Sequence, residues 1–153
     1  MPKPILLVED NPRDLELTLL ALERSQLAHE VVVLRDGAEA LDYLLRRNAH
    51  AERETGNPAV MLLDLKLPKV DGLEVLAQVR AHPQLRTLAI IMLTSSQEKP
   101  DLQRAHELGV SAYLVKPVEF KDFVSAIAGL EVFWAVLDKP APGIPCLNPG
   151  SNH

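Results

Sequence analysis

A chain of 153 residues is short enough for one domain, and its core can bury enough surface to fold without disulfides or structural metals. Hydrophobic residues make up 47% of the chain and charged residues 24%, which excludes an intrinsically disordered protein. The net charge of −5 argues against nucleic acid or a membrane as partner, and the single cysteine, Cys146, excludes a disulfide framework.

Short apolar runs recur along the chain and predict buried strands. The first apolar run, Ile5–Val8, is too short for a signal peptide or a membrane span, so we expect a cytoplasmic protein. Continuous runs of Val, Ile and Leu are typical of strands that are covered on both faces of a parallel sheet. The five predicted strands are Ile5–Val8, Val31–Leu34, Val60–Leu63, Ala89–Leu93 and Tyr113–Val115.

Helix-capping residues begin the first three segments between these strands. Asn11 and Pro12 offer an N-cap followed by proline at the first helical position. Asp36 and Asp71 each precede a glutamate by three residues, which is the spacing of a capping box. We therefore expect helices after the first, second and third strands.

The last two helices and two irregular segments complete the chain. A fourth helix is expected from about residue 98 to 108, ended by Gly109, and a fifth from about 119 to 137. Residues 48–58 are polar and predict an extended loop or a short helical extension. Residues 138–153 hold four prolines and two glycines and predict a tail without an effector domain.

The alternation of strands and helices predicts an α/β fold, a doubly wound parallel sheet of the flavodoxin-like (βα)5 kind with strand order 2-1-3-4-5. Ligands of such sheets bind beyond the carboxyl ends of the strands. Polar residues stand at four of these ends, and they are Glu9, Asp10, Asp64, Thr94 and Lys116.

These five side chains suit a phosphoryl-transfer site with a cation. Clustered carboxylates repel one another unless a cation lies between them, and hard oxygen ligands favour Mg²⁺. Thr94 and Lys116 suit the oxygens of a phosphoryl group. Asp64 lies at the centre of the predicted sheet and is the candidate nucleophile. Each residue alone has an ordinary explanation, such as a helix cap or a solvated lysine, and only the conjunction favours the functional interpretation.

The chain resembles the receiver domain of two-component response regulators over residues 4–137. The resemblance depends on the residues around the strand ends, which are Leu7–Asn11, Leu62–Gly72, Leu93–Ser95 and Tyr113–Pro117. It implies that Asp64 accepts a phosphoryl group from a sensor histidine kinase. It also implies that Mg²⁺ is bound by Asp10, Asp64 and the backbone carbonyl of Lys66, with Glu9 acting through a water.

The resemblance assigns roles to three further positions. Thr94 and Lys116 would contact the phosphoryl oxygens, and Thr94 would move on activation so that the switch residue Tyr113 turns inward. Without the family, Tyr113 is an ordinary aromatic at the edge of the sheet. The resemblance also implies a cis peptide bond between Lys116 and Pro117.

Two stretches and a pair of aromatic residues resemble the corresponding residues of the response regulators that pair with bacterial and cyanobacterial phytochromes. They are Val8–Asp14, Arg35–Leu44 and Phe133-Trp134. This similarity implies a phytochrome-type sensor histidine kinase, a red-light sensor, as the phosphodonor. Residues 138–153 are too few for an output domain, so we expect output through changed protein contacts.

The last predicted helix has more apolar residues than one sheet face can cover. We therefore expect a homodimer through this helix, the alternative being that the tail covers the extra surface. The predicted core-facing stripe contains Phe123, Ile127, Leu130, Trp134 and Leu137, and the apolar residues outside it are Val132, Phe133 and Val136.

Other functions stay open as alternatives. The protein could be a phosphate sink or a scaffold for a kinase that is not a phytochrome. A Mg²⁺-dependent phosphatase of the haloacid-dehalogenase kind also uses an aspartate nucleophile, but its second aspartate is replaced here by Lys66. The first strand–helix turn has no glycine-rich loop, which excludes a dinucleotide-binding protein.

Overall fold

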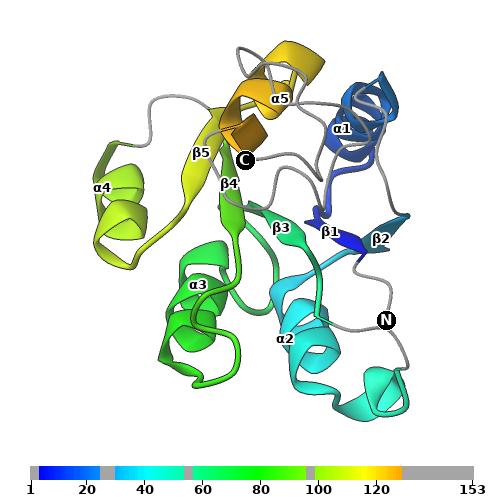
Figure 1. Ribbon diagram of the computed structural model, residues 1–153, viewed down its shortest axis with the longest axis vertical. Coiled ribbons are helices and arrows are strands. Elements are labelled where there is room, and N and C mark those ends of the chain that lie inside the picture. Colours follow the sequence, from blue (N-terminus) through cyan, green and yellow to red (C-terminus); the bar gives the residue numbers. More distant parts are fainter. Residues whose placement is uncertain (1–3, 25–29, 54–56, 96–98, 129–153) are drawn as a thin grey trace, which may run out of the picture.

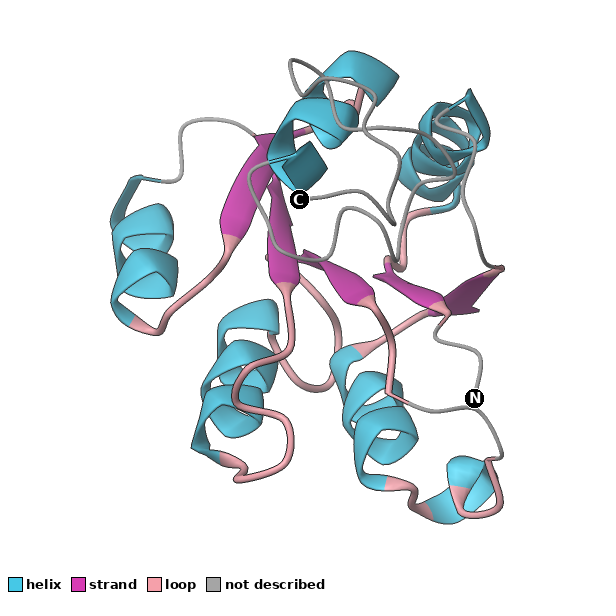
Figure 2. Ribbon diagram, viewed as in Figure 1, coloured by secondary structure: helices cyan, strands magenta, loops and turns pink. Residues whose placement is uncertain are grey.

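The computed structural model describes residues 4–24, 30–53, 57–95 and 99–128. In this part of the chain five parallel strands form one sheet with helices on both faces (Figures 1 and 2). The strand order β2-β1-β3-β4-β5 confirms the predicted flavodoxin-like fold. The elements in chain order are β1 (Ile5–Val8), α1 (Pro12–Arg24), β2 (Val31–Leu34), α2 (Gly37–Leu45), η1 (Asn48–His50), β3 (Val60–Asp64), α3 (Gly72–Ala81), β4 (Ile90–Thr94), α4 (Lys99–Glu107), β5 (Ala112–Val115) and α5 (Phe120–Ala128).

The sheet separates two apolar cores. Successive side chains of a strand point to opposite faces, so Ile5 and Leu7 pack with α1 and α5, whereas Leu6 and Val8 pack with residues of α2 and α3. Figure 1 shows α1 and α5 together on one side of the sheet and α2 and α3 on the other. Burial on both faces explains why the central strands are continuous apolar runs rather than alternating ones.

The predicted helix starts are confirmed, although they differ in detail. The Asn11 side chain accepts hydrogen bonds from the backbone N–H groups of Arg13 and Asp14, at 2.9 and 3.0 Å. Asp36 caps α2 by accepting from the N–H of the third helical residue at 2.7 Å. Asp71 instead accepts from the adjacent N–H of Gly72, so α3 begins without the capping box that its sequence predicts.

The start of α2 is in contact with the loop that follows β3. The N–H of Gly37 donates to the carbonyl of Pro68 at 3.4 Å, and the ammonium of Lys69 lies 3.6 Å from the carboxylate of Asp36. A Cβ atom on Gly37 would lie 1.8 Å from the carbonyl oxygen of Val70. Only glycine therefore lets α2 approach this loop so closely.

The predicted boundaries shift by one residue at several elements. β3 and β4 each extend to the polar residue that was expected just beyond them, because backbone hydrogen bonds continue past Asp64 and Thr94. β5 begins one residue earlier than predicted, at Ala112. Gly109 follows α4 with a φ of 89°, as expected of a residue that ends a helix.

Two predicted segments have different outcomes. The segment 48–58 contains η1, which confirms the short helical extension. The fifth helix is confirmed up to Ala128, and the rest of the predicted helix and the predicted tail, residues 129–153, lie outside the described residues. Among the helices that the structure describes, none is long and apolar enough to cross a membrane.

The contact between Gly37 and the loop after β3 gives a stability prediction. We expect Gly37→Ala to lower the free energy of unfolding by about 1–3 kcal/mol, because the added methyl group must displace the backbone of Val70. Urea unfolding followed by circular dichroism measures the change. An increase in stability, which alanine normally gives in a helix, would contradict the close approach.

Candidate functional site

The carboxyl ends of the strands bring the predicted side chains together at one edge of the sheet. Glu9 and Asp10 directly follow β1, Asp64 ends β3, Thr94 ends β4, and Lys116 directly follows β5. β1, β3, β4 and β5 are consecutive neighbours in the sheet. The parallel register places Asp64 beside Leu93 and Thr94 beside Val115, so residues far apart in sequence share one edge.

Three carboxylates form a cluster that could hold a cation. Glu9, Asp10 and Asp64 each offer an oxygen within 4.8 Å of the other two. Glu9 and Asp64 are buried, whereas Asp10 is exposed. An all-oxygen set that is open to water on one side fits a hard divalent ion such as Mg²⁺, which retains several of its waters.

Among the described residues, the positively charged group that lies next to these carboxylates is the ammonium of Lys116. It lies 2.9 Å from Asp14, 3.3 Å from Asp64 and 3.4 Å from Glu9. The hydrogen bond with Asp14 and the charges of Asp64 and Glu9 outweigh the burial of the ammonium and raise the pKa of Lys116. The lysine therefore stays charged at every physiological pH. The peptide bond to Pro117 is cis, which confirms that prediction.

Asp14 is the site residue that sequence reasoning missed. Its position in the first turn of α1 has an ordinary explanation, because acidic residues favour helix N-termini. Yet its carboxylate makes the shortest of the three contacts with Lys116. Its spacing in the sequence could have indicated this position. Asp14 comes four residues after Asp10 and three after the cap Asn11, so the first turn of the helix keeps it near the end of β1.

The hydroxyl of Thr94 is buried without a partner. Its Oγ1 has no hydrogen-bond partner among the described residues, and the residue is fully buried. Buried hydroxyls normally form hydrogen bonds, and an unpaired one at a strand end is a sign of a missing ligand. The oxygen of a phosphoryl group on Asp64 would provide such a partner.

The loop after β3 is connected to α4. The backbone N–H of Lys66 points to Asp64 Oδ1 at 3.4 Å, and its ammonium forms an ion pair with Asp101 at 3.1 Å. The side chain of Lys66 thus lies between the acidic cluster and the first turn of α4. The assignment of its backbone carbonyl as a metal ligand stays a prediction.

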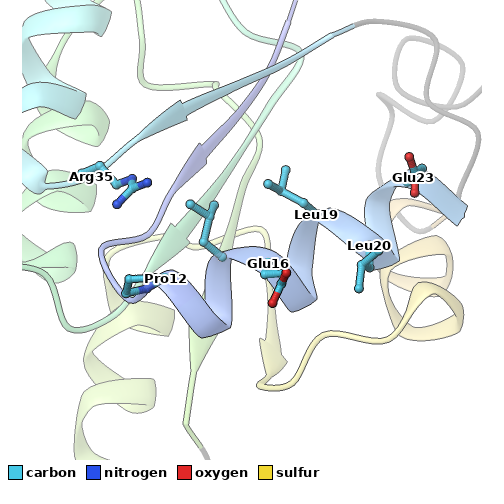
Figure 3. Close-up of a pocket in the computed structure, with 7 residues that line it drawn as sticks. Pro12, Glu16, Leu19, Leu20, Glu23 and Arg35 are labelled. Atoms are coloured by element: carbon cyan, nitrogen blue, oxygen red, sulfur yellow. The ribbon is translucent and has the colours of Figure 1, made fainter.

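A hollow beside α1, toward the end of β2, lies apart from this chemistry. Figure 3 shows Leu19, Leu20, Glu16 and Glu23 along the helix, with Arg35 across from them after β2. None of the residues of the acidic cluster lines it. The candidate site is therefore identified by the charges that converge at the strand ends rather than by this hollow.

Comparison with protein families gives one match over most of the chain. The model for the response regulator receiver domain matches residues 5–128. The chain belongs to the response regulator receiver family. The matched range lies inside the predicted domain of residues 4–137, whose exact limits stay a prediction.

Relatives of known structure and sequence place this receiver within the family. The bacteriophytochrome response regulator RtBRR is 68% identical, with a TM-score of 0.82 over 94% of this chain and 86% of that one. The response regulator Rcp1 of Synechocystis sp. is 39% identical over 87% of this chain and 89% of its own length.

Two solved structures of such relatives contain the groups that matter for the site. One is the Mn²⁺-bound form of Rcp1, 38% identical with a TM-score of 0.72, and the match covers 92% of this chain and 99% of that one. The other is the phosphorylated cyanobacterial phytochrome response regulator RcpA, also 38% identical with a TM-score of 0.72, over 88% and 94% of the two chains. This chain is thus similar to the phytochrome-associated receivers.

Tyr113 lies on β5, one of the two edge strands of the described sheet. It is 54% exposed, and Met92 is its register partner on β4. Thr94 lies two residues further along β4, so the two predicted switch residues occupy neighbouring strands. An exposed tyrosine fits both the ordinary edge aromatic and the outward position of a switch, and the switching role stays a prediction.

Glu9 is the most strongly perturbed carboxyl group of the site. Burial, together with the hydrogen bond and the charge of Asp64, raises the pKa of Glu9 to about 8. Near neutral pH the metal-free receiver therefore holds a proton on Glu9. A divalent cation favours the ionised carboxylate and competes with this proton, so cation binding releases it.

The raised pKa of Glu9 gives a pH prediction for the metal-free receiver. Between about pH 4.5 and pH 8 the unfolded chain loses this proton while the folded protein keeps it, so Glu9 contributes stability at low pH that is lost as the pH rises. We expect Glu9→Gln, which stays neutral, to match the wild-type melting temperature near pH 5 and to exceed it near pH 8.

Thermal unfolding in the presence of a chelator measures this difference across the pH range. Adding Mg²⁺ should reduce the advantage of Glu9→Gln at high pH, because the cation stabilises the ionised wild-type carboxylate. A difference between the two proteins that stays constant with pH would show that Glu9 does not titrate in this window.

Proposed function

We propose that this receiver is a phosphoacceptor of a two-component system and that Asp64 accepts the phosphoryl group. The observation that carries the proposal is the arrangement around Asp64. A buried carboxylate lies 3.3 Å from an ammonium, within an acidic cluster, and near a buried hydroxyl that has no hydrogen-bond partner among the described residues. These are the groups that phosphoryl transfer to a carboxylate requires.

The transfer depends on positioning and charge neutralisation rather than on a base. An oxygen of Asp64 forms the new bond to phosphorus while the bond from phosphorus to the donor imidazole nitrogen of the kinase breaks. The nitrogen keeps the electron pair and takes a proton from solvent. Lys116 offsets the charge that accumulates on the phosphoryl oxygens, and Thr94 donates its hydroxyl hydrogen to one of them.

We propose Mg²⁺ as the cation, held by Asp10, Asp64 and the backbone carbonyl of Lys66, with Glu9 acting through a water. The oxygen-only cluster supports a hard divalent ion, and a related structure contains Mn²⁺. When bound, the ion would neutralise charge on the phosphoryl oxygens. The residues of this chain would fix the ion beside Asp64 and would keep the ammonium of Lys116 near the same carboxylate.

We propose a phytochrome-type sensor histidine kinase as the phosphodonor and signalling through protein contacts as the output. The names of the relatives support the donor, because RtBRR and RcpA are both phytochrome response regulators. The Lys66–Asp101 ion pair supports a path to α4, since it connects the loop after Asp64 with that helix. In this proposal the protein passes on a signal and acts chemically only on its own aspartyl phosphate.

We expect Asp64→Asn to abolish phosphorylation, because the amide cannot form the acyl phosphate. The receiver is incubated with Mg²⁺ and acetyl phosphate, and intact-protein mass spectrometry counts the added phosphoryl groups. Asp122→Asn, an exposed change in the first turn of α5, is the matched control and should be modified like the wild type. Equal modification of Asp64→Asn, or none of the wild type, would refute the proposed site.

The donor is tested separately with purified kinases. Transfer from an autophosphorylated phytochrome-type kinase should be faster than transfer from a histidine kinase with an unrelated sensor. If acetyl phosphate modifies Asp64 but the two kinases transfer at equal rates, the phosphoacceptor function stands and the phytochrome assignment is wrong.

We also propose that the protein forms a homodimer through its last helix. Phe123 and Ile127, the first members of the predicted core-facing stripe, are fully buried, which supports the predicted orientation of this helix. The apolar residues that the sequence pattern places outside this stripe, among them Phe133, are the ones that we propose to pack against a second copy.

Sedimentation velocity at micromolar concentration tests the dimer. We expect the wild type to sediment as a dimer and Phe133→Glu as a monomer, because a buried charge at an apolar interface is costly. Leu20→Glu, which changes an exposed apolar residue on α1, should leave the dimer intact. A monomeric wild type, both with and without phosphorylation, would remove this proposal.

A further inference from the structure

Lys116 contacts a carboxylate outside the acidic cluster, that of Asp14, in addition to two carboxylates of the cluster. Its ammonium touches Glu9, Asp14 and Asp64, and the shortest distance, 2.9 Å, is to Asp14. We propose that Asp14 is a positioning residue that holds the Lys116 ammonium in the unphosphorylated protein and competes with the phosphoryl group for it. This inference rests on the proposed function of Asp64 as the phosphoacceptor.

Local structure fixes Asp14 in this position. Its backbone N–H donates to the cap residue Asn11 at 3.0 Å, which anchors the first turn of α1 next to the end of β1. The Asp14 side chain is 29% exposed and that of Lys116 is 12% exposed. A charge-assisted hydrogen bond in such a partly desolvated place is stronger than an ion pair in open solvent.

Asp14 is separate from the carboxylates that could bind the cation. Glu9, Asp10 and Asp64 form the acidic cluster, and Asp14 is not part of it. A cation among those three residues would draw Glu9 and Asp64 toward itself. Asp14 would then remain as the main carboxylate partner of Lys116, so the competition persists when the metal site is filled.

Phosphorylation changes what the lysine must neutralise. Transfer adds a group that carries close to two negative charges at neutral pH, while the ammonium still has one positive charge and three N–H donors. Three carboxylates already occupy these donors. In this arrangement the lysine turns to the phosphoryl oxygens by weakening an existing contact. With Glu9 and Asp64 drawn toward a cation, the contact with Asp14 remains, and it competes with the phosphoryl group for the charge of the ammonium.

Asp14 makes and breaks no covalent bond in this scheme. The bond from Asp64 oxygen to phosphorus forms, the bond from phosphorus to the donor breaks, and the leaving group keeps the electron pair, as in the proposed function. The effect of Asp14 is electrostatic. Its negative charge partly offsets the positive charge of Lys116, so the lysine stabilises the incoming phosphoryl group less and the transfer is slower.

The test compares Asp14→Asn with the wild type. We expect Asp14→Asn to be phosphorylated by acetyl phosphate roughly two- to fivefold faster at saturating Mg²⁺, the size of effect that one partly exposed ion pair gives. Asp14→Glu keeps the charge and should return the rate toward that of the wild type. Glu16→Gln removes an exposed negative charge from the same helix without a contact to Lys116, and its rate should equal that of the wild type.

A readout without phosphorylation reports the contact directly. Hydrogen bonds slow the exchange of ammonium protons with water, so in the metal-free wild type an NMR signal of the Lys116 ammonium should be observable. We expect this signal to weaken or disappear in Asp14→Asn and to persist in Glu16→Gln.

A double-mutant cycle with Lys116→Gln separates the proposed role from a general charge effect. The rate gain of Asp14→Asn should vanish in the Lys116→Gln background. An unchanged rate in Asp14→Asn, or a gain that persists without Lys116, would refute the competition while leaving Asp64 as the phosphoacceptor. Absence of phosphorylation in the wild type would instead refute the proposed function itself.

Discussion

The structure at the edge of the sheet depends on one lysine ammonium placed among carboxylates. Glu9, Asp14 and Asp64 come from two different strand ends and from α1, and each lies within 3.4 Å of Lys116. Without this positive charge, buried carboxylates so close together would repel one another or take up protons. One positive charge does not balance them all, which leaves room for a cation. Burial, together with the hydrogen bond and the charge of Asp64, raises the pKa of Glu9.

The two-faced burial of the sheet is the reason why the polar groups converge at its edge. Side chains within β1, β3 and β4 are covered by helices on both sides, so polar groups can be placed only where the strands end. The parallel arrangement then puts all carboxyl ends at the same edge. The contact of Gly37 with the loop after β3 and the Lys66–Asp101 ion pair extend this edge to α2 and α4.

Much of the fold and the site could be predicted because the signals are local. The apolar runs predicted five strands, and the residues at their ends predicted Glu9, Asp10, Asp64, Thr94 and Lys116 as one group. The predicted ends of β3 and β4 each came one residue too early, since a polar residue can continue a ladder of backbone hydrogen bonds, and β4 also begins one residue later than predicted, at Ile90. At α3 the expected capping box is absent, because Asp71 accepts from the adjacent N–H and Glu74 accepts a hydrogen bond from Gln78.

The sequence by itself was enough to predict the strand order and the receiver resemblance and to name Asp64 as the candidate nucleophile, because periodicity and strand-end chemistry are local to short segments. Only the tertiary structure decided which charges meet. Asp14 has the ordinary pattern of a first-turn acid, and its contact with Lys116 spans 102 positions of the chain. The burial of the Thr94 hydroxyl, which has no partner within the described part of the chain, and the exposure of Tyr113 likewise depend on which strands and helices cover them. Packing decides such contacts, because the position of Asp14 in the first turn of a helix does not by itself distinguish an ordinary helix-start acid from a partner of Lys116.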